Sequence, residues 1–255
     1  MSDAPDPNDP YSRLSYRRLI AWPARIQREA PFLREVLGAA PSRRLLDLGC
    51  GTGEHARFLQ EEGFAVTGVD ASDAQLAQAR EGGPGPEFVK GDLAALGEAV
   101  SGRFGGAIAL GNGLPHLFAD GMARFLSGLA GLLLPGSPVL FQLLNYDRIL
   151  DQRITSLPLN VREDDAERVV FLRLMDPHPD GTVVFNPTTL RWRPGEEPPV
   201  EVVTGKNVIL KAWRRVELEA ALAAAGFRID DVFGGMKRET WDAATSSDTV
   251  VLARR

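Results

Sequence analysis

The sequence predicts an α/β fold, a doubly wound sheet of seven strands with an N-terminal helical lid and an antiparallel β insertion. Three observations carry this prediction. Apolar strand-like segments alternate with helical segments between residues 44 and 144, which is typical of a parallel sheet covered by helices on both faces. A glycine-rich turn, Gly49-Cys50-Gly51-Thr52-Gly53, follows the first strand. After Tyr146 the pattern changes to segments rich in β-branched and aromatic residues separated by turns, which favours antiparallel strands.

The N-terminal part of the chain divides into a tail and a lid. Residues 1–10 are rich in proline and aspartate, so they lack the apolar groups needed for packing and are predicted to be a disordered tail. Residues 11–40 carry apolar side chains at helical spacing, which predicts two or three helical segments. We expect these segments to lie across the mouth of a ligand site at the carboxyl ends of the strands. We expect Pro23 and Pro31 to break or kink these segments.

The central segments alternate regularly. Strands are predicted at about 44–48, 65–69, 87–90, 105–110 and 138–144, and helices at about 53–62, 73–81, 93–100 and 119–134. Ligands of such sheets bind at the carboxyl ends of the strands. Gly49, Asp70, Asp92 and Leu110 all fall at such ends, so we expect them to share one site.

An antiparallel β insertion is predicted over residues 151–211. Its segments at 168–175, 182–192 and 200–211 are separated by turns that contain proline and glycine. The core then resumes with a helix at about 214–225, which ends at Gly226, and with strands at 227–234 and 248–254. The predicted core domain therefore consists of residues 11–150 and 212–255.

Composition limits the possible ligands. The 255 residues carry a net charge of −5 and no basic block, which disfavours a broad nucleic-acid-binding face. Cys50 is the single cysteine, so neither an intramolecular disulfide nor a cysteine-based zinc cluster can form. The three histidines, His55, His116 and His178, are not spaced as metal ligands, and we expect no metal.

A membrane segment is not predicted. The most apolar run, residues 125–144, contains Pro135-Gly136-Ser137-Pro138 and is interpreted as a helix, a turn and a strand. The first residues are acidic and lack the basic and apolar regions of a signal peptide, so the expected location is the cytoplasm. The sequence leaves the oligomeric state open.

The glycine spacing indicates which nucleotide is bound. A dinucleotide fingerprint would place its third glycine at position 54, where this chain has Glu54. A carboxylate there would repel a pyrophosphate seated on the helix N-terminus. The sequence therefore predicts a nucleoside ligand without phosphates.

The turn resembles motif I of the class I methyltransferases that use S-adenosylmethionine, D-x-G-x-G-x-G, here formed by Asp47, Gly49, Gly51 and Gly53. The resemblance implies a Rossmann-like methyltransferase sheet, S-adenosylmethionine as cofactor and S-adenosylhomocysteine as product. It also implies that the glycine backbone passes under the methionyl group of the cofactor.

The second and third strands end in acids to which this resemblance gives roles. Asp70, followed by Ala71, would accept both ribose hydroxyls, a contact suited to a carboxylate. Asp92 would bind the adenine amino group, and the backbone amide of Leu93 would donate to the ring. The alternative for Asp92 is a helix N-cap, and both roles can coexist.

Two further segments resemble the glycine/sarcosine N-methyltransferases. Gly111-Asn112-Gly113-Leu114-Pro115-His116-Leu117 matches G-N-x-x-x-H-L, and Asn145-Tyr146-Asp147-Arg148-Ile149-Leu150 matches N-Y-D-x-I-L. The likeness includes Trp22, Arg25 and the insertion. It implies that Leu110, Asn112 and His116 contact the cofactor, that Arg25 pairs with its carboxylate and that Trp22 helps to close the lid.

Two of these residues, Arg25 and His116, also have structural alternatives. Arg25 could be a solvated helix charge beside Arg28 and Glu29, although a guanidinium is well suited to bind a carboxylate. His116 could be a buried histidine, and Cys50 is best interpreted as a small core residue.

The residues expected around the acceptor bear on which small molecule is methylated. Asn112, His116 and Tyr146 are candidates to orient the methyl acceptor, and His116 could also accept a proton. In the glycine enzymes an arginine before N-Y-D binds the acceptor carboxylate, whereas this chain has Leu144. Glycine is therefore disfavoured unless Arg148, Arg173 or Arg191 supplies the charge. The aromatic residues of the insertion region could line the pocket or form its core, the core being favoured: Phe171, Phe185, Trp192 and Trp213.

The sequence thus predicts methyl transfer from S-adenosylmethionine to a small molecule, with an amine nitrogen as the expected acceptor. Three alternatives stay open: O- or C-methyl transfer, a nicotinamide-dependent oxidoreductase, and a non-catalytic module that binds an adenosyl ligand.

Overall fold

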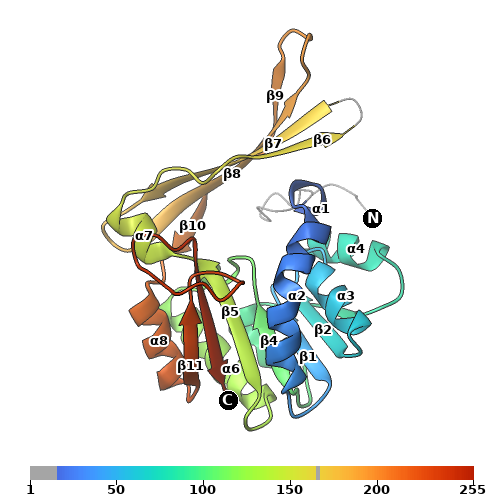
Figure 1. Cartoon of the computed structure of the whole chain (residues 1–255), viewed down its shortest axis with the longest axis vertical. Coiled ribbons are helices and arrows are strands. Elements are labelled where there is room, and N and C mark those ends of the chain that lie inside the picture. Colours follow the sequence, from blue (N-terminus) through green and yellow to red (C-terminus); the bar gives the residue numbers. More distant parts are fainter. Residues whose placement is uncertain (1–15, 165–166) are drawn as a thin grey trace.

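The computed structural model describes residues 16–164 and 167–255, and a seven-stranded sheet forms its centre (Figure 1). The strand order is β11-β12-β5-β4-β1-β2-β3. All neighbours are parallel except β12, which runs antiparallel to β5 and β11. The strands are β1 (Arg44–Leu48), β2 (Ala65–Asp70), β3 (Glu87–Lys90), β4 (Gly106–Ala109), β5 (Pro138–Leu144), β11 (Arg228–Phe233) and β12 (Asp248–Arg254). The predicted fold class is confirmed.

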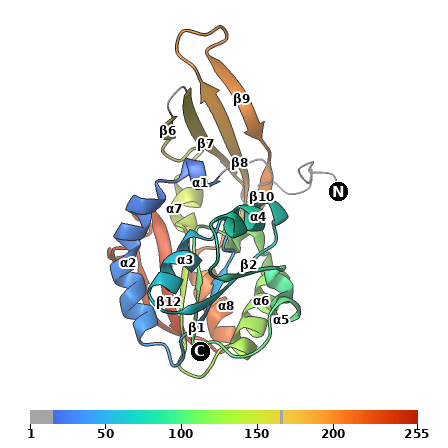
Figure 2. The same ribbon diagram turned by 90° about the vertical axis from the view of Figure 1, so that its right-hand side faces the viewer.

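Helices cover both faces of this sheet, as Figure 2 shows with α2 on one side and α5 and α6 on the other. On the first side α2 (Trp22–Gly38) and α3 (Glu54–Glu61) bury apolar side chains against β1, β2 and β4. On the second side α5 (Leu96–Ala99), α6 (Ala119–Leu132) and α8 (Arg215–Ala224) do the same. The remaining helices are α1 (Tyr16–Leu19), α4 (Asp73–Glu81), α7 (Tyr146–Asp151) and the 3₁₀ turns η1 (Leu93–Ala95) and η2 (Leu114–His116).

Of the break or kink expected at Pro31, the break is wrong, because α2 continues through this residue, and the kink stays a prediction. Pro23 stands in the first turn, where a backbone N–H needs no partner inside the helix. Pro31 is exposed, and the opposite side of the helix is fixed in the core by Leu33 and Leu37, which are both fully buried. Burial of that stripe compensates for the one missing hydrogen bond. The predicted tail, and the lid residues before residue 16, lie outside the described residues.

The segment after α7 forms a second, five-stranded antiparallel sheet that stands above the carboxyl end of the core sheet (Figure 1). Its strands are β6 (Asn160–Asp164), β7 (Glu167–Pro177), β8 (Thr182–Trp192), β9 (Val200–Gly205) and β10 (Val208–Lys211). β7 and β8 form its centre, β6 pairs with β7, and β9 and β10 pair with successive parts of β8. We call this the insertion sheet.

Two details of the insertion sheet differ from the prediction. The segment at 200–211 forms two strands, because β9 pairs with residues 188–192 of β8 and β10 with residues 182–185. Between them, the Asn186 side-chain amide donates to Asn207 Oδ1 at 2.9 Å. β6 was not predicted, because Asn160-Val161-Arg162-Glu163-Asp164 has one apolar residue and lies at a sheet edge, where polar side chains are common.

The insertion sheet is anchored at two places. At its lower end Met175 and Phe185 belong to the same buried cluster as Trp213, whose indole N–H donates to the Leu117 carbonyl at 2.8 Å. Farther along the sheet, at the middle of β7, Leu19 of α1 packs against Phe171, and each is about 2% exposed. The favoured core interpretation is therefore confirmed for Phe171, Phe185 and Trp213, whereas Trp192 is exposed. The division of the chain into domains stays a prediction.

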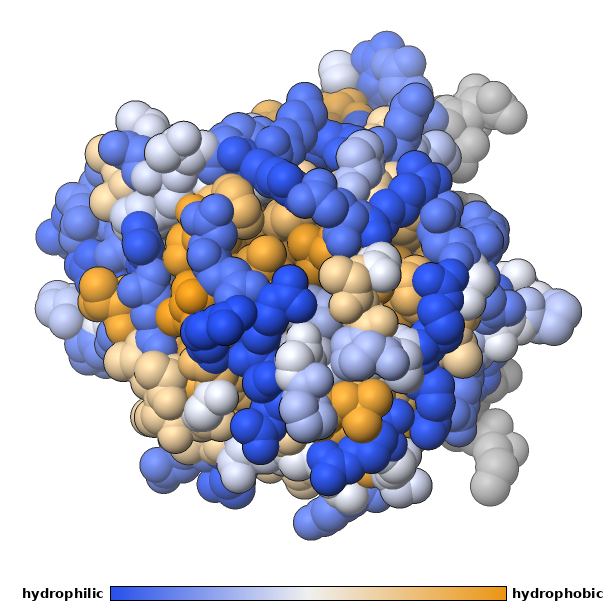
Figure 3. All heavy atoms as spheres, turned by 60° about the horizontal axis from the view of Figure 1, so that its bottom comes forward, coloured by the Kyte–Doolittle hydropathy of each residue, from blue (hydrophilic) through white to orange (hydrophobic). Residues whose placement is uncertain are grey.

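The outer surface is of mixed character. Figure 3 views the molecule from the side of the end opposite the insertion sheet, where hydrophilic residues surround smaller apolar patches. Within residues 16–164 and 167–255, no helix combines the length and the apolar character needed to cross a bilayer.

Candidate active site

The carboxyl ends of β1, β2, β4 and β5 meet at the edge of the core sheet that faces the insertion sheet (Figure 1). The register places Leu48 beside Val69, and Ala109 beside Phe141. The segments that follow these strands therefore converge, as expected for a ligand site in a doubly wound sheet.

The glycine turn has a backbone that only glycine adopts without strain. Gly49, Gly51 and Gly53 have φ values of 72°, 54° and 82°. A Cβ at Gly49 would meet no heavy atom within 4 Å, so the turn presents bare backbone there. Gly53 differs, because a Cβ would lie 2.5 Å from the Phe88 ring. Gly49 thus leaves space for a ligand, whereas Gly53 is also required by packing.

Asp70 holds this turn in place. Its Oδ2 accepts the Gly51 amide at 2.8 Å and its Oδ1 accepts the Ser72 amide at 2.9 Å. The side chain is half-buried, and Ala71 beside it is exposed. Each carboxylate oxygen has a second lone pair, so Asp70 can accept hydroxyl groups while it holds the turn.

Asp47 is a buried carboxylate below the turn. It is 2% exposed and accepts the backbone amide of Ala56, while its Oδ2 has no hydrogen-bond partner within the described residues. Burial, with the nearby negative charge of Asp70 as a second cause, raises the pKa of Asp47 to about 7. A cationic group would be a suitable partner for this oxygen.

Arg25 is not a solvated helix charge, so that alternative is wrong. Its side chain is 15% exposed and lies over the Trp22 ring, with 5.0 Å from the guanidinium carbon to the ring centroid. Its Nε donates to Glu29 Oε1 at 2.9 Å, and its Nη2 donates to Gln142 Oε1 at 3.2 Å. The predicted lid residues Trp22 and Arg25 are thus brought against the end of β5.

Asn112 connects the ends of β4 and β5. It adopts a φ of 70°, which asparagine tolerates better than most residues. Its Oδ1 accepts the Leu144 amide at 3.0 Å, and its Nδ2 donates to the Tyr146 hydroxyl at 3.1 Å. Tyr146 is fully buried, which raises the pKa of its phenol, and Leu110 before the turn is also buried.

His116 and Asp92 lie nearer to solvent. His116 is exposed at the end of η2, so the alternative of a buried histidine is wrong; surrounding protein still lowers the pKa of its ring by desolvation. Asp92 caps η1, because its Oδ1 accepts the Ala94 amide at 2.8 Å. The N-cap interpretation of Asp92 is therefore confirmed, and Leu93 beside it is half-buried.

Cys50 has the expected core position. The side chain is 9% exposed, and burial raises the pKa of its thiol. Burial therefore favours the protonated thiol, which is the less nucleophilic form.

The three arginines considered as substitutes at position 144 lie on or next to the insertion sheet. Arg191 pairs with Glu201 at 3.1 Å, and Arg173 donates to the Pro158 carbonyl at 2.9 Å. Arg148 and Arg173 line a cavity of about 580 Å³ beside residues 156–159. Leu144 itself is half-buried at the end of β5.

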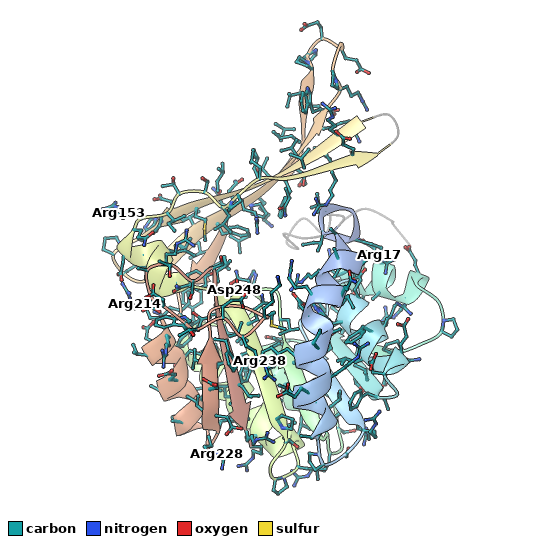
Figure 4. The ribbon with its side chains drawn as sticks, in the orientation of Figure 1. Arg17, Arg153, Arg214, Arg228, Arg238 and Asp248 are labelled. Atoms are coloured by element: carbon teal, nitrogen blue, oxygen red, sulfur yellow. The ribbon has the colours of Figure 1, made fainter. Side chains whose placement is uncertain are left out.

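Sequence reasoning missed four polar residues around Arg25: Glu29, His55, Gln142 and Asp248. Gln142 accepts the Gly111 amide at 3.2 Å and donates to Asp248 at 3.0 Å. Asp248 is the first residue of β12 and is labelled in Figure 4. Glu29, Gln142 and Asp248 also line a cavity of about 360 Å³. The one available signal was the spacing of Arg25 and Glu29, four residues apart on one helix.

Comparison with known proteins relates this chain to methyltransferases. Residues 45–136 match the family model of a methyltransferase domain. The glycine/sarcosine N-methyltransferase of Parasynechococcus marenigrum (strain WH8102) is 33% identical over 139 residues, which are 52% of this chain and 49% of that protein. The chain spans about half the length of the curated relatives it matches.

Solved structures resemble nearly the whole chain. The CcbJ methyltransferase from Streptomyces caelestis is 25% identical with a TM-score of 0.71, covering 90% of this chain and 89% of that one. CalS10 from Micromonospora echinaspora, an amino pentose methyltransferase solved with S-adenosylmethionine bound, is 21% identical with a TM-score of 0.71 and covers 94% of both chains. Both likenesses show agreement in fold over nine tenths of the chain or more.

Proposed function

Because the chain carries a class I S-adenosylmethionine-dependent methyltransferase domain, we propose that it transfers a methyl group from this cofactor to an amine nitrogen of a small molecule. The observation that carries the proposal is the glycine turn held by Asp70 at the carboxyl edge of the sheet, beneath the insertion sheet. The N-methyltransferase name of the relative supports nitrogen as the acceptor atom.

The polar groups of the site match the cofactor. Asp70 would bind the ribose hydroxyls, and Asp92 with Leu93 would bind the adenine. Asp47 Oδ2, which has no hydrogen-bond partner among residues 16–164 and 167–255, would fit the ammonium group of the methionyl tail, and Arg25 would fit its carboxylate. Leu110 and His116 would complete the wall, with Trp22 and Asn112 beside them.

When bound, S-adenosylmethionine supplies a methyl group on a sulfonium, which is already a good leaving group. The protein therefore has to align the acceptor and exclude water. The buried Tyr146 side chain would help to align the acceptor, and the insertion sheet above the site would help to exclude water.

Tyr146, Asn112 and His116 would orient the acceptor. The Tyr146 oxygen accepts from Asn112, so its own hydrogen is left to donate. Its raised pKa keeps it protonated, so Tyr146 is an orienting group and not a base. The lowered pKa of His116 favours the neutral ring, which can accept the proton that an amine loses on methylation.

Leu144 argues against glycine as the acceptor, because an apolar side chain cannot bind a carboxylate. Arg173 already donates to the Pro158 carbonyl and Arg191 already pairs with Glu201, so Arg148 is the substitute that stays open. We therefore propose an acceptor that is uncharged at this position or larger than glycine.

A screen of amines, amino acids and phenols, read by the release of S-adenosylhomocysteine, tests the proposal. We expect turnover with an amine and at least tenfold less with glycine. Asp70→Ala should abolish both cofactor binding and turnover, and Asp73→Ala, an exposed acid on α4, is the matched control. Methylation confined to phenols would instead show O-transfer. Cofactor binding without any product would indicate a binding module.

A further inference from the structure

Three residues of α2 and one of α3 contact one another in a ring. Trp22, Arg25 and Glu29 are spaced three and four residues apart, so they share one face of α2. Glu29 Oε1 accepts from Arg25, and Glu29 Oε2 lies 2.7 Å from His55 Nε2. The His55 ring meets Trp22 edge-on, with centroids 5.4 Å apart at 89°. Each member therefore contacts two others.

Burial defines the charges in this set. Glu29 is 1% exposed and His55 is 7% exposed. Although burial alone would raise the pKa of Glu29, the hydrogen bonds from His55 and Arg25 keep it below its ordinary value, so the carboxylate is ionised. Burial lowers the pKa of His55, which is therefore neutral at pH 7. A neutral ring facing a carboxylate carries its proton on Nε2 and donates it to Glu29.

The contacts fix the direction of the Arg25 guanidinium. Glu29 holds Nε and Gln142 holds Nη2, which leaves Nη1 without a hydrogen bond among the described residues. His55 is the second residue of α3, directly after the glycine turn. The Glu29–His55 contact therefore ties the lid helix, and with it Arg25, to the turn on which the methionyl tail would lie.

We propose that Glu29 and His55 are positioning residues that hold Arg25 ready for the carboxylate of the amino-acid tail of the cofactor. The inference rests on the proposed function and deepens it. Glu29 and His55 do not touch the ligand, yet through Arg25 this buried pair would let the protein distinguish ligands that carry the amino-acid tail from ligands that lack it. A pair with a purely structural role would affect both kinds of ligand equally.

Two ligands and three variants test this inference by calorimetry. S-adenosylhomocysteine carries the amino-acid tail, whereas 5′-methylthioadenosine has the same adenosine and sulfur without it. We expect His55→Leu and Arg25→Ala to weaken binding of S-adenosylhomocysteine about tenfold or more, while 5′-methylthioadenosine changes by less than about twofold. His55→Gln, which keeps a donor at a similar distance, should retain most of the affinity.

Different results would overturn the positioning role and the proposed function. The positioning role would be overturned if His55→Leu weakened binding of both ligands equally or left the affinity for S-adenosylhomocysteine unchanged. It would also be overturned if the wild-type protein bound both ligands equally well. Wild-type protein that binds neither ligand would overturn the proposed function itself. Thermal unfolding of each variant identifies loss of folding, and Glu29→Gln then replaces a variant that fails to fold.

Discussion

At the scale of single residues, the carboxylate of Asp47 is costly for the protein without a ligand. It lies on β1, is 2% exposed and leaves one oxygen without a hydrogen bond among the described residues. A buried ionised group without a full set of partners destabilises the fold. Such a group persists where a site needs it, and a positively charged ligand group would remove the cost.

This cost predicts a pH dependence. The folded pKa of about 7 exceeds the ordinary 3.8, so between those pH values only the folded protein keeps the proton. Stability from this group is complete below about pH 4, falls as the pH rises towards 7 and is constant above. We expect Asp47→Asn to gain stability relative to wild type between pH 4 and pH 8, by at most about 4 kcal/mol.

Urea unfolding of the two proteins across this pH range measures the difference. If the free energies of unfolding of the two proteins changed equally with pH, the assignment of a raised pKa to Asp47 would be contradicted. The ligand-free proteins must be compared, because a bound cation would stabilise the ionised form.

At the scale of elements, the short helix α1 joins the lid to the insertion sheet. It has four residues, and Leu19 packs against Phe171 of β7 in a small cluster of their own. Nearby, Arg17 pairs with Glu54 at 2.8 Å and donates to the Thr52 carbonyl at 3.1 Å, so the same helix also reaches the glycine turn (Figure 4). A small cluster opens more readily than the main core.

A shorter side chain at Leu19 should therefore increase local opening of α1 and of the segment around Phe171, and leave the main core unchanged. We expect Leu19→Ala to accelerate amide hydrogen exchange in α1 and around Phe171 about tenfold or more, because the buried contact is lost. Exchange in β1, β4 and β5 should change by less than about twofold. Val216→Ala, at an exposed apolar residue of α8, is the matched control. Uniform acceleration in all strands would show that α1 is part of the main cooperative unit instead.

The sequence predicted the elements of the core because each has its own local signal. The predicted strands at 44–48, 87–90 and 138–144 match the structure residue by residue, since their apolar runs are bounded by turn residues. Pro31 and β6 were misjudged because long-range packing decides both. A buried stripe keeps α2 intact, and β6 is a strand only because β7 offers it an edge.

At the scale of the whole molecule, the lid, the core and the insertion sheet surround one region. The glycine turn and Asp70 come from the core, Arg25 from the lid helix, and the insertion sheet lies above them. A ligand that contacts all three parts stabilises the folded state by mass action, because it binds the assembled site and not the unfolded chain.

S-adenosylhomocysteine should therefore raise the unfolding temperature, with about 2.7 kcal/mol of added stability at 100 times its dissociation constant. Reduced nicotinamide dinucleotide should produce no shift, because Glu54 stands where its pyrophosphate would need a glycine. Thermal unfolding with each ligand makes the comparison, and Asp70→Ala should lose the response. An equal shift with the dinucleotide would instead favour an oxidoreductase.

The sequence by itself determined the alternation of strands and helices, the glycine turn and the acids at the strand ends, because these are patterns over a few neighbouring residues. Only the tertiary structure joined Arg25, Glu29, His55 and Gln142, which come from α2, α3 and β5. Their burial and hydrogen bonds arise when distant segments pack, and no local pattern encodes that. Within the part of the chain that the structure describes, the same packing leaves one Asp47 oxygen without a hydrogen bond, and the cofactor roles of these residues stay predictions for the experiments above.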